Sequence, residues 1–441
     1  MTTSNPFHHL ALLLLFLLLA PLLSAALHHC ATPPTSQSTL QIIHFNSPCS
    51  PFRPQNHHQL SWIDTLLEMQ SKDHDRVTYL SSLVARRSVV PIAWARPILK
   101  NPTYIVNVRV GTPPQSMLMA MDTSNDAAWL PCSGCVGCSP KTVFNTLRST
   151  TFSRLGCKTA QCKQVPNSVC ANSTCTFGFI YGTSSIAANL SRDAVKLANN
   201  DTVSGFTFGC VKSVNGSSMP PQGLLGLGRG PMSLLSQTQS LYKSTFSYCL
   251  PSFKSSSFTG SLRLGPVAQP KRIKFTPLLK NPRRSSLYYV NLIGIRVGRR
   301  VVDVPSGALS FNPTTGAGTI IDSGTVFTRL VEPAYIAVRN AFRKRIGNAT
   351  VTSLGGFDTC YTSSIVAPTI TFMFTGMNVT LPPENLMIHS TAGSTSCLAM
   401  AAAPANVDSV LNVIANMQQQ NHRILFDVPN NRIGVAREPC S

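Results

Sequence analysis

Apolar and polar residues follow three different patterns along the chain. Nearly every residue from Leu10 to Leu23 is apolar, and the small residues Ser24-Ala25-Ala26 follow. From Ser61 to Leu83 the apolar positions recur at helical spacing, which predicts a helix. After Pro97, short runs of Val, Ile, Phe and Tyr alternate with turns of Gly, Ser, Asn and Pro. This pattern is typical of a largely antiparallel β protein, with its clearest helix from Glu332 to Arg345.

The apolar run near the N-terminus predicts that the protein is exported. Pro21 interrupts the run and small residues close it, as in a secretory signal peptide, which we expect at residues 1–26. An uncleaved membrane anchor is the alternative, but the run is short for one. Residues 27–96 contain the predicted helix and the dibasic pair Arg86-Arg87, and we interpret them as a pro-segment. We expect an extracellular protein without a membrane span.

The number of cysteines agrees with export. The chain has 14 cysteines, and an even number in an exported chain indicates disulfides. The cluster Cys132-Ser-Gly-Cys135-Val-Gly-Cys138 permits a zinc knuckle as an alternative, but it lacks nearby His ligands. We expect no metal ion and no cofactor. Asn-x-Ser/Thr sequons, the expected glycan acceptors after export, occur at Asn172, Asn189, Asn200, Asn215, Asn348 and Asn378.

The chain is strongly basic. Its net charge is +21, with 37 Lys and Arg against 16 Asp and Glu. A positive field of that size favours polyanionic neighbours, such as an acidic cell-wall polysaccharide. The basic residues are scattered in small clusters without interleaved aromatic residues, so nucleic acid is not an expected partner. The simplest interpretation is a solvated basic surface on a monomer.

One pattern occurs twice in the chain. Met119-Ala-Met-Asp122-Thr-Ser and Thr319-Ile-Ile-Asp322-Ser-Gly are both apolar strands that run into an Asp turn, 200 positions apart. A second apolar run follows each of them, at residues 223–228 and 412–415. An isolated Asp turn means little, because turns favour these residues. The shared lead-in and the shared downstream run predict two related halves that each contribute one carboxylate.

Two carboxyl groups that share one proton can hydrolyse a peptide bond. The ionised group takes a proton from water while the protonated group donates to the carbonyl oxygen. Such a pair titrates as a unit, because like charges about 3 Å apart cannot both ionise easily. Thr123 and Ser323 are placed for hydrogen bonds across the interface between the halves. Asn125 and Thr325 are predicted to donate to the outer carboxylate oxygens.

Three segments carry a family resemblance: Tyr104-Ile-Val-Asn-Val-Arg-Val-Gly-Thr-Pro-Pro-Gln115, Phe179-Ile-Tyr-Gly-Thr-Ser184 and the stretch from Gln418 to Gly434. They resemble the opening strand, the flap and the closing segment of the pepsin-like aspartic proteases, most closely the plant subgroup that includes nepenthesin. The cysteine cluster between Cys132 and Cys175 resembles the N-terminal insertion of that subgroup. The similarity covers residues 104 to 440.

This resemblance implies a fold and a function. The fold is all-β and bilobal, with two pseudo-twofold-related β lobes and a few short helices. The N-terminal lobe, residues 104–270, contains Asp122, the flap and the Cys-rich insertion, and the C-terminal lobe, residues 285–441, contains Asp322. The resemblance makes Asp122 and Asp322 the catalytic residues of an aspartic endopeptidase, and Tyr181 the flap residue that closes over the substrate. The substrates are proteins or peptides, cleaved at acidic pH in the apoplast or cell wall.

The resemblance also implies how the cysteines pair. Spacing alone does not choose among the many connectivities of twelve cysteines. The disulfides carried over from the plant subgroup are Cys132–Cys135, Cys138–Cys210, Cys157–Cys175, Cys162–Cys170, Cys249–Cys440 and Cys360–Cys397.

The chain departs from the family pattern at three positions, one of which is Asn125, where the first motif has Ser. Ser124 stands where the first motif has Gly, and Ala415 replaces a Gly downstream of Asp322. If the first turn needs a Gly-only backbone conformation, Ser124 is strained. The main alternative function is therefore a catalytically weak or inactive protease-like binding protein, such as a glycanase inhibitor. A nucleic-acid-associated protease is a third hypothesis, which the signal peptide and the disulfides disfavour.

Overall fold

The structure is a computed structural model. It describes residues 39–47, 50–52, 62–84, 104–181, 184–197, 201–217, 219–252, 259–267, 269–282, 284–389, 395–404 and 410–440. The predicted signal peptide and the Arg86-Arg87 pair lie outside the described residues, as do Cys30, Cys49 and Asn200.

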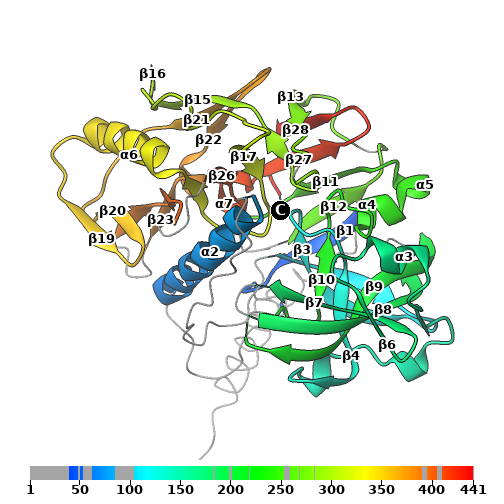
Figure 1. The fold of residues 1–441 in the computed structure, drawn as a ribbon. Helices are drawn as coiled ribbons and strands as arrows, with labels where there is room; N and C mark the ends of the chain where they lie inside the picture. The colour runs from blue at the N-terminus through cyan, green and yellow to red at the C-terminus, as the bar shows by residue number, and fades with distance from the viewer. Residues whose placement is uncertain are drawn as a thin grey trace, which may run out of the picture.

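Each half of the chain forms a β lobe, and the two lobes repeat one strand arrangement (Figure 1). In the first half, β2 (Tyr104–Val110) pairs antiparallel with β3 (Gln115–Asp122), and β10 (Leu224–Gly226) runs parallel to the end of β3. In the second half, β26 (Leu411–Ile414) runs parallel to β17 (Gly318–Ile321) in the same way. The internal repeat predicted from the sequence is therefore present in the strand pairing, and the bilobal β fold is confirmed.

An antiparallel sheet joins the two lobes. β11 (Thr245–Cys249) pairs with β27 (His422–Asp427), which comes from the end of the chain. β27 continues to β28 (Arg432–Arg437), and β28 pairs with β13 (Lys274–Leu279). Aromatic rings fill the junction, where Phe426 lies 4.5 Å from the ring centroids of both Phe246 and Tyr288.

A strand of the predicted pro-segment lies inside this sheet. β1 (Thr39–His44) pairs with β12 (Thr259–Leu264) on one side and with β2 on the other. Its residues Leu40, Ile42 and His44 are buried. Sequence analysis separated the pro-segment from the lobes, whereas the structure makes this part of it a component of the joining sheet.

The two predicted helices are present within one residue of their expected ends. α2 (Trp62–Val84) packs an apolar face against the second lobe, where Leu66 contacts the cluster that contains Phe327. α6 (Glu332–Ile346) has three basic residues in its last turn, which suits the negative end of its dipole. Helices long and apolar enough to cross a membrane are absent from the described part of the chain.

The other elements are short strands and short helices. The strands are β4 (Trp129–Val136), β5 (Ser153–Arg154), β6 (Val169–Ala171), β7 (Thr174–Tyr181), β8 (Ser184–Lys196), β9 (Thr202–Asn215), β14 (Tyr289–Val290), β15 (Leu292–Val297), β16 (Arg300–Val301), β18 (Thr328–Leu330), β19 (Val351–Leu354), β20 (Phe357–Tyr361), β21 (Ile370–Phe374), β22 (Met377–Leu381), β23 (Met387–His389), β24 (Ser396–Leu398) and β25 (Met400–Ala402). The helices are η1 (Pro140–Thr142), η2 (Thr146–Arg148), α3 (Ala160–Gln164), α4 (Leu234–Gln237), α5 (Gln239–Tyr242), η3 (Pro383–Asn385) and α7 (Asn416–Gln419).

The cysteine pairing in the first part of the insertion differs from the expected one. Cys132 bonds Cys210 and Cys135 bonds Cys138, so the pairs Cys132–Cys135 and Cys138–Cys210 are wrong. The reason is the sheet: β4 lies parallel to β9 with Leu130 opposite Cys210, which brings Cys132 next to Cys210. All three cysteines of the alternative zinc knuckle are in disulfides.

The second part of the insertion also pairs differently. The bonds are Cys157–Cys170 and Cys162–Cys175, so the expected Cys157–Cys175 and Cys162–Cys170 are wrong. Cys170 and Cys175 are opposite each other in β6 and β7, with Cys170 exposed and Cys175 buried. Helix α3 buries Cys162 in the same cluster as Cys175, and burial therefore decides the pairing.

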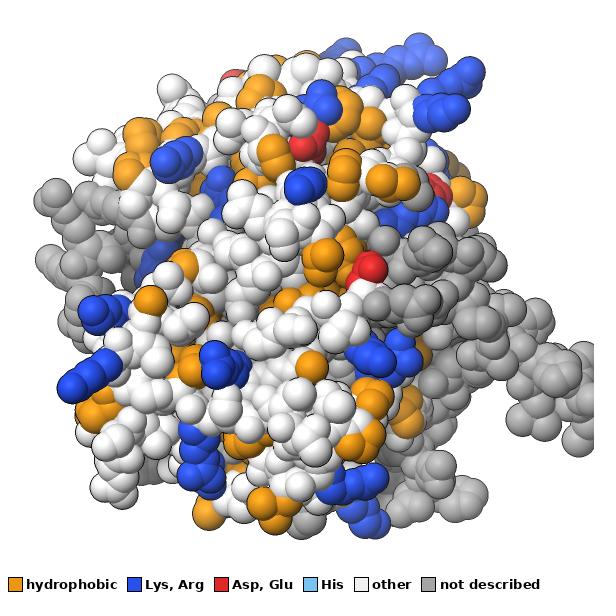
Figure 2. Space-filling view, turned by 90° about the vertical axis from the view of Figure 1, so that its right-hand side faces the viewer, with side chains coloured by type: hydrophobic (Ala, Val, Ile, Leu, Met, Phe, Trp, Pro, Cys, Tyr) orange, Lys and Arg blue, Asp and Glu red, His pale blue; other side chains and the backbone are white. Residues whose placement is uncertain are grey.

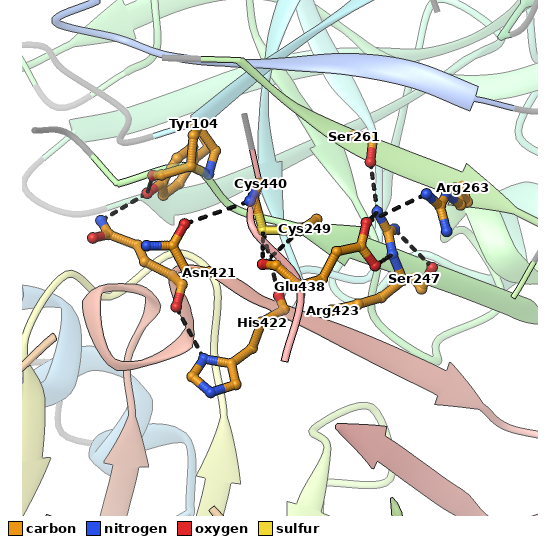
Figure 3. Close-up of a disulfide and its surroundings, with 12 residues drawn as sticks. Tyr104, Ser247, Cys249, Ser261, Arg263, Asn421, His422, Arg423, Glu438 and Cys440 are labelled. Atoms are coloured by element: carbon orange, nitrogen blue, oxygen red, sulfur yellow. Dashed lines mark hydrogen bonds and ion pairs between the residues drawn. A yellow bond between two sulfur atoms is a disulfide. The ribbon is translucent and has the colours of Figure 1, made fainter. Parts of the chain in front are cut away.

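The two disulfides expected in the later part of the chain are confirmed as Cys249–Cys440 and Cys360–Cys397. Figure 3 shows Cys440 held against β11 beside the buried Arg423. Arg423 donates to both carboxylate oxygens of Glu438 at 2.7 Å. Burial opposes ionisation of Glu438, but these bonds outweigh it and lower the pKa of Glu438. The closing segment is thereby fixed to the joining sheet.

Candidate active site

The two predicted catalytic carboxylates lie side by side at the interface of the lobes. Asp122 ends β3 and Asp322 directly follows the equivalent strand β17, and the two residues are 1% and 0% exposed. The backbone N–H of Thr123 donates to Ser323 Oγ at 3.2 Å, and the N–H of Ser323 donates to Thr123 Oγ1 at 3.0 Å. Thr123 Oγ1 also lies 3.5 Å from Asp322 Oδ1. These reciprocal bonds across the interface, predicted from the sequence, hold the two turns together.

The outer oxygen of each carboxylate has the donor that the sequence predicted. Asn125 Nδ2 donates to Asp122 Oδ2 at 2.6 Å, and Thr325 Oγ1 donates to Asp322 Oδ2 at 2.5 Å. Different side chains thus make the same contact in the two halves. Both fix the plane of a carboxylate, as a shared-proton pair requires.

Ser124 fits the first turn without backbone strain. It is not among the residues with positive φ, so the turn does not need a Gly-only conformation. Its N–H and its Oγ donate to Asp122 Oδ1 at 2.9 and 3.0 Å, whereas its counterpart Gly324 has only its N–H to donate to Asp322 Oδ1, at 3.3 Å. The substitution therefore adds a donor to the inner oxygen of Asp122.

Sequence analysis missed a third charged residue at this site, Arg76 of helix α2. Its Nη1 and Nη2 donate to Asp122 at 3.0 and 2.8 Å, and its Nε and Nη2 donate to Asp322 at 2.9 Å each. Arg76 Nη2 also donates to Ser124 Oγ at 2.6 Å. Nothing in the sequence distinguishes Arg76 from the other basic residues, because its role depends on where α2 docks.

The charge of Arg76 favours the ionised form of Asp122. Burial opposes ionisation of Asp122, but the guanidinium and the hydrogen bonds from Ser124 and Asn125 outweigh it, so the pKa of Asp122 lies below its ordinary value. Burial also works to lower the pKa of Arg76, yet the two carboxylates raise it well above its ordinary value. The site is an ion triad in which one cation joins both anions.

A second polar contact anchors α2 beside the triad. Asp73 accepts hydrogen bonds from the backbone N–H groups of Val326 and Phe327 at 2.8 and 2.6 Å. Arg329 Nη2 donates to the carbonyl oxygen of Gln70 at 2.9 Å. Burial raises the pKa of Asp73 to about 7, although the charge of Arg329 and the two N–H groups act in the opposite direction.

The predicted flap residue lies next to the same carboxylates. Tyr181 ends β7 and is paired with Ser184 of β8, and its ring packs edge-on against Trp129 at 5.3 Å. Burial raises the pKa of Tyr181, and the charge of Asp122 adds to this effect. Trp129 is 2% exposed and therefore belongs to the core.

The remaining predicted features lie on the surface. Asn172, Asn215, Asn348 and Asn378 are exposed, and Asn189 is half-buried on β8. Lys and Arg side chains are dispersed over the face drawn in Figure 2 and do not form a continuous stripe. Within the described ranges, no group of three or more His, Cys, Asp or Glu residues could hold a metal ion.

Comparison with known proteins places this site in a family. The chain matches the family described as Xylanase inhibitor N-terminal over residues 104–266 and the one described as Xylanase inhibitor C-terminal over residues 287–437. It is 52% identical to Aspartyl protease AED3 of Arabidopsis thaliana, over 93% of this chain and 94% of the relative. Aspartic proteinase nepenthesin-2 of Nepenthes gracilis is 33% identical, over 76% of this chain and 78% of the relative.

The chain belongs to the pepsin-like aspartic proteases of plants. The crystal structure of edgp has the same fold, with a TM-score of 0.64 at 19% identity, over 92% of this chain and 96% of that one. Two buried aspartates from two related lobes are thus found in a family whose relatives are named as proteases, and the family resemblance stated from the sequence is confirmed.

Proposed function

We propose that this plant aspartic protease family member is a secreted endopeptidase made as an inactive precursor. One observation carries the proposal: Thr123 and Ser323 bond each other across the lobes and hold two buried carboxylates beside one guanidinium. A cation that contacts both Asp122 and Asp322 requires their oxygens to converge on one space. That is the arrangement that two carboxyls sharing a proton need.

The residues of the chain support a general acid–base mechanism once Arg76 is withdrawn. Without the cation, the two carboxyls titrate as a unit and retain one proton at acidic pH. The ionised member takes a proton from water, and the protonated member donates to the carbonyl oxygen of the peptide. Asn125 and Thr325 keep the outer oxygens in place, and Tyr181 covers the site from the flap. We expect apolar side chains to be preferred next to the scissile bond.

Helix α2 would keep the precursor inactive. Arg76 offsets part of the negative charge of the pair and occupies the space of the attacking water, while Asp73 and Gln70 hold the helix on the second lobe. Removal of residues 27–96 would then open the site. The four exposed sequons and the six disulfides suit a protein that passes through an oxidising, secretory compartment.

The test measures cleavage of unfolded globin by the processed protein between pH 3 and 6, with and without pepstatin. We expect pepstatin-sensitive cleavage that Asp122→Asn or Asp322→Asn lowers by a factor of about 10³ or more. Asp303→Asn, at an exposed carboxylate, is the matched control and is expected to leave cleavage unchanged. Pepstatin-insensitive or absent cleavage would refute the proposal.

The family descriptions favour a second candidate, a protein that binds and inhibits a glycanase. Both matched regions are described as parts of a xylanase inhibitor, and a basic 7S globulin from lupine seeds shares the fold, with a TM-score of 0.61 at 21% identity. One fold hosts several functions, so the two candidates must be separated by experiment. A tight complex with a xylanase, unaffected by Asp122→Asn, would favour the inhibitor.

A further inference from the structure

Gln419 is a buried side chain that lies beneath the second aspartate turn. It belongs to α7 and is 2% exposed. Its Nε2 donates to the carbonyl oxygen of Asp322 at 3.1 Å and to that of Ile414 at 2.8 Å. Its Oε1 accepts a hydrogen bond from the hydroxyl of Tyr248 in β11. Because Nε2 faces two carbonyl oxygens, which are acceptors only, these contacts fix the orientation of the amide.

The contacts of Gln419 continue as a chain of hydrogen bonds to the carboxylate of Asp322. The carbonyl that Gln419 holds and the N–H of Ser323 belong to one peptide group. That N–H donates to Thr123 Oγ1 at 3.0 Å, and Thr123 Oγ1 lies 3.5 Å from Asp322 Oδ1. Since the hydroxyl oxygen already accepts one bond, its proton is free for the carboxylate. We call this chain the relay; its members are Tyr248, Gln419, the peptide group between Asp322 and Ser323, and Thr123.

Every donor of the relay points towards the carboxylate of Asp322. Burial raises the pKa of Tyr248 well above its ordinary value, and the charge of Asp322 adds to this effect, so the hydroxyl of Tyr248 stays protonated and donates. Hydrogen bonds that are aligned in this way polarise one another, by about 10–30% per bond. Each donor of the relay therefore strengthens the last contact, from Thr123 to the carboxylate, and favours negative charge there.

The equivalent chain in the first half ends on a different group. The backbone N–H of Leu227 donates to the carbonyl oxygen of Asp122 at 2.8 Å, and the N–H of Thr123 donates to Ser323 Oγ at 3.2 Å. Ser323 Oγ then donates to the carbonyl oxygen of Met121 at 3.4 Å. Within the described residues, only the chain of the second half reaches a carboxylate, and it is the one that begins with two side chains.

We propose that Gln419 and Tyr248 are positioning residues that act through the relay to support the ionised form of Asp322 in the catalytic pair. The inference rests on the proposed function, because it concerns how that pair shares its proton. In the precursor, Arg76 Nη2 donates to Asp322 Oδ1 at 2.9 Å, beside the longer contact from Thr123. Once Arg76 has left, the relay supplies the hydroxyl donor of this oxygen.

The groups around Asp322 give the relay a pH signature. The ionisable groups that face it within the described residues are Asp122, Tyr181, Tyr248 and, in the precursor, Arg76. Burial raises the pKa of both tyrosines, so they stay neutral at acidic pH. After removal of Arg76, Asp122 and Asp322 compete for one proton. Loss of the relay weakens the ionised form, so the pair takes up its second proton at a higher pH.

The test begins with Tyr248→Phe in the processed protein, because this variant removes the first donor and keeps the ring. We expect kcat for a peptide substrate to fall about fivefold with KM changed by less than about twofold, the size of one net hydrogen bond. The acidic limb of the pH profile, where activity is lost as the pair takes up its second proton, should move up by about half a pH unit.

The matched control is a second buried tyrosine that is bonded to the next glutamine. Tyr104 donates to the carbonyl oxygen of Pro251 and accepts from Gln420 Nε2, at 2.9 Å each. Among the residues that the structure describes, these bonds do not lead to either aspartate. Tyr104→Phe should therefore lower the free energy of unfolding about as much as Tyr248→Phe, measured in denaturant. It should leave kcat and the acidic limb unchanged, which separates the relay from a merely structural role.

Substitutions at Gln419 keep the proposal testable if Tyr248→Phe does not fold. A buried Glu is neutral at acidic pH, so in Gln419→Glu it still accepts from Tyr248 and donates to the carbonyl of Asp322. We expect this variant to cleave nearly as well as the wild type at pH 3 and to fall behind it towards pH 6, as the Glu ionises and loses its proton. Gln419→Met, which has no donor, should be impaired at both pH values.

The outcomes separate the relay from the proposed function. Infrared difference spectra follow the titration of the carboxyl pair without cleavage, and Asp322→Asn identifies its band. An upward shift in Tyr248→Phe but not in Tyr104→Phe would support the relay even in a protein that cleaves nothing, a result that refutes the endopeptidase alone. Cleavage with the same kcat and pH profile in both variants would overturn the relay alone. Neither cleavage nor a shift would refute both.

Discussion

The two aspartate turns share the bonds between Thr123 and Ser323 but leave different amounts of space around them. A Cβ added to Gly226, which is paired with Asp122, would overlap the carbonyl oxygen of Ala127 and lie 2.7 Å from that of Asn125. Ala415 occupies the equivalent position after β26, is fully buried and donates its N–H to Thr328 Oγ1 at 3.1 Å. The departure at Ala415 is therefore found in the half that has room for a methyl group.

On the side of the turns that faces Arg76, the difference in space is reversed, because here the first turn has room for a side chain and the second does not. A side chain at Gly324 would overlap the guanidinium of Arg76, whereas Ser124 accepts a hydrogen bond from that guanidinium. The cation thus enters over the glycine of the second turn and beside the serine of the first. The comparison teaches that the departures at Ser124 and Ala415 each lie where their own half accommodates them, so neither indicates a damaged site.

The largest expected effect comes from removing the cation that both turns share. Arg76→Gln leaves two buried carboxylates unpaired, and we expect the precursor to lose about 3–5 kcal/mol of stability and its latency. Denaturant unfolding and globin cleavage by the unprocessed protein measure the two effects. Lys72→Gln, which breaks a partly exposed pair with Glu68 on the same helix, should cost at most about 0.5 kcal/mol. Equal effects of the two variants would contradict the ion triad.

Substitutions at Gly226 and Ala415 directly test the difference in space between the two halves. Gly226→Ala forces a methyl group against backbone oxygens, and we expect it to lower the free energy of unfolding by about 1–3 kcal/mol and to reduce cleavage. Ala415→Gly only removes a methyl group and should cost about 0.5–1 kcal/mol. Denaturant unfolding of both variants gives the comparison. A larger loss of stability in Ala415→Gly than in Gly226→Ala would contradict the inference that only the second half has room for a methyl group at this position.

Acidification should weaken the docking of α2 through the first turn. The pKa of Asp122 is lowered by Arg76 in the docked state. The stabilisation that ionised Asp122 gives to the docked helix is therefore present above the ordinary Asp pKa of about 3.9, and it is lost as the pH falls below that value. We expect the free energy of unfolding of the precursor to decrease below about pH 4, and less so in Asp122→Asn. Denaturant unfolding between pH 3 and 7 checks this.

Two other groups of the pro-segment titrate over the same range with opposite signs. Burial lowers the pKa of His44 to about 3, so its contribution is lost as the pH falls from about 6.5 to about 3. Burial raises the pKa of Asp73 to about 7, so its protonation favours docking as the pH falls from about 7 to about 3.9. The contributions of His44 and Asp73 to the free energy of unfolding therefore oppose each other until the pH is low enough to protonate Asp122. A precursor that is most stable at pH 3 would contradict this balance.

The smallest expected effect is that of Ser124→Gly, which makes the turns alike. The variant removes one hydroxyl donor from Asp122 Oδ1, so the pKa of Asp122 should increase and the acidic limb of the pH profile should move up by less than about one unit. Cleavage at the optimum should change by about threefold or less. Ser116→Gly, at an exposed residue of β3, serves as control. A tenfold loss in Ser124→Gly would mean that the hydroxyl is essential.

Local sequence patterns predicted much of the fold and the two aspartates of the site, but not the role of Arg76. The helix that contains Arg76 and the two Asp turns were predicted because periodicity and turn chemistry are properties of short segments. The supporting roles of Thr123 and Asn125 followed from the repeat of one motif. The cysteine pairing failed at four bonds, because it depends on the register of β4 with β9 and on which cysteines α3 buries.

The sequence by itself determined that there are two related halves, that each ends a strand in an aspartate, and that a helix of about six turns precedes them. The tertiary structure alone decided that Arg76 enters between Asp122 and Asp322, that β1 is a strand of the joining sheet, and that Asp73 accepts the N–H groups of Val326 and Phe327. The physical reason is distance along the chain. The charges of Arg76 and Asp322, separated by 246 positions, meet only when the lobes pack, and no local spacing encodes that meeting.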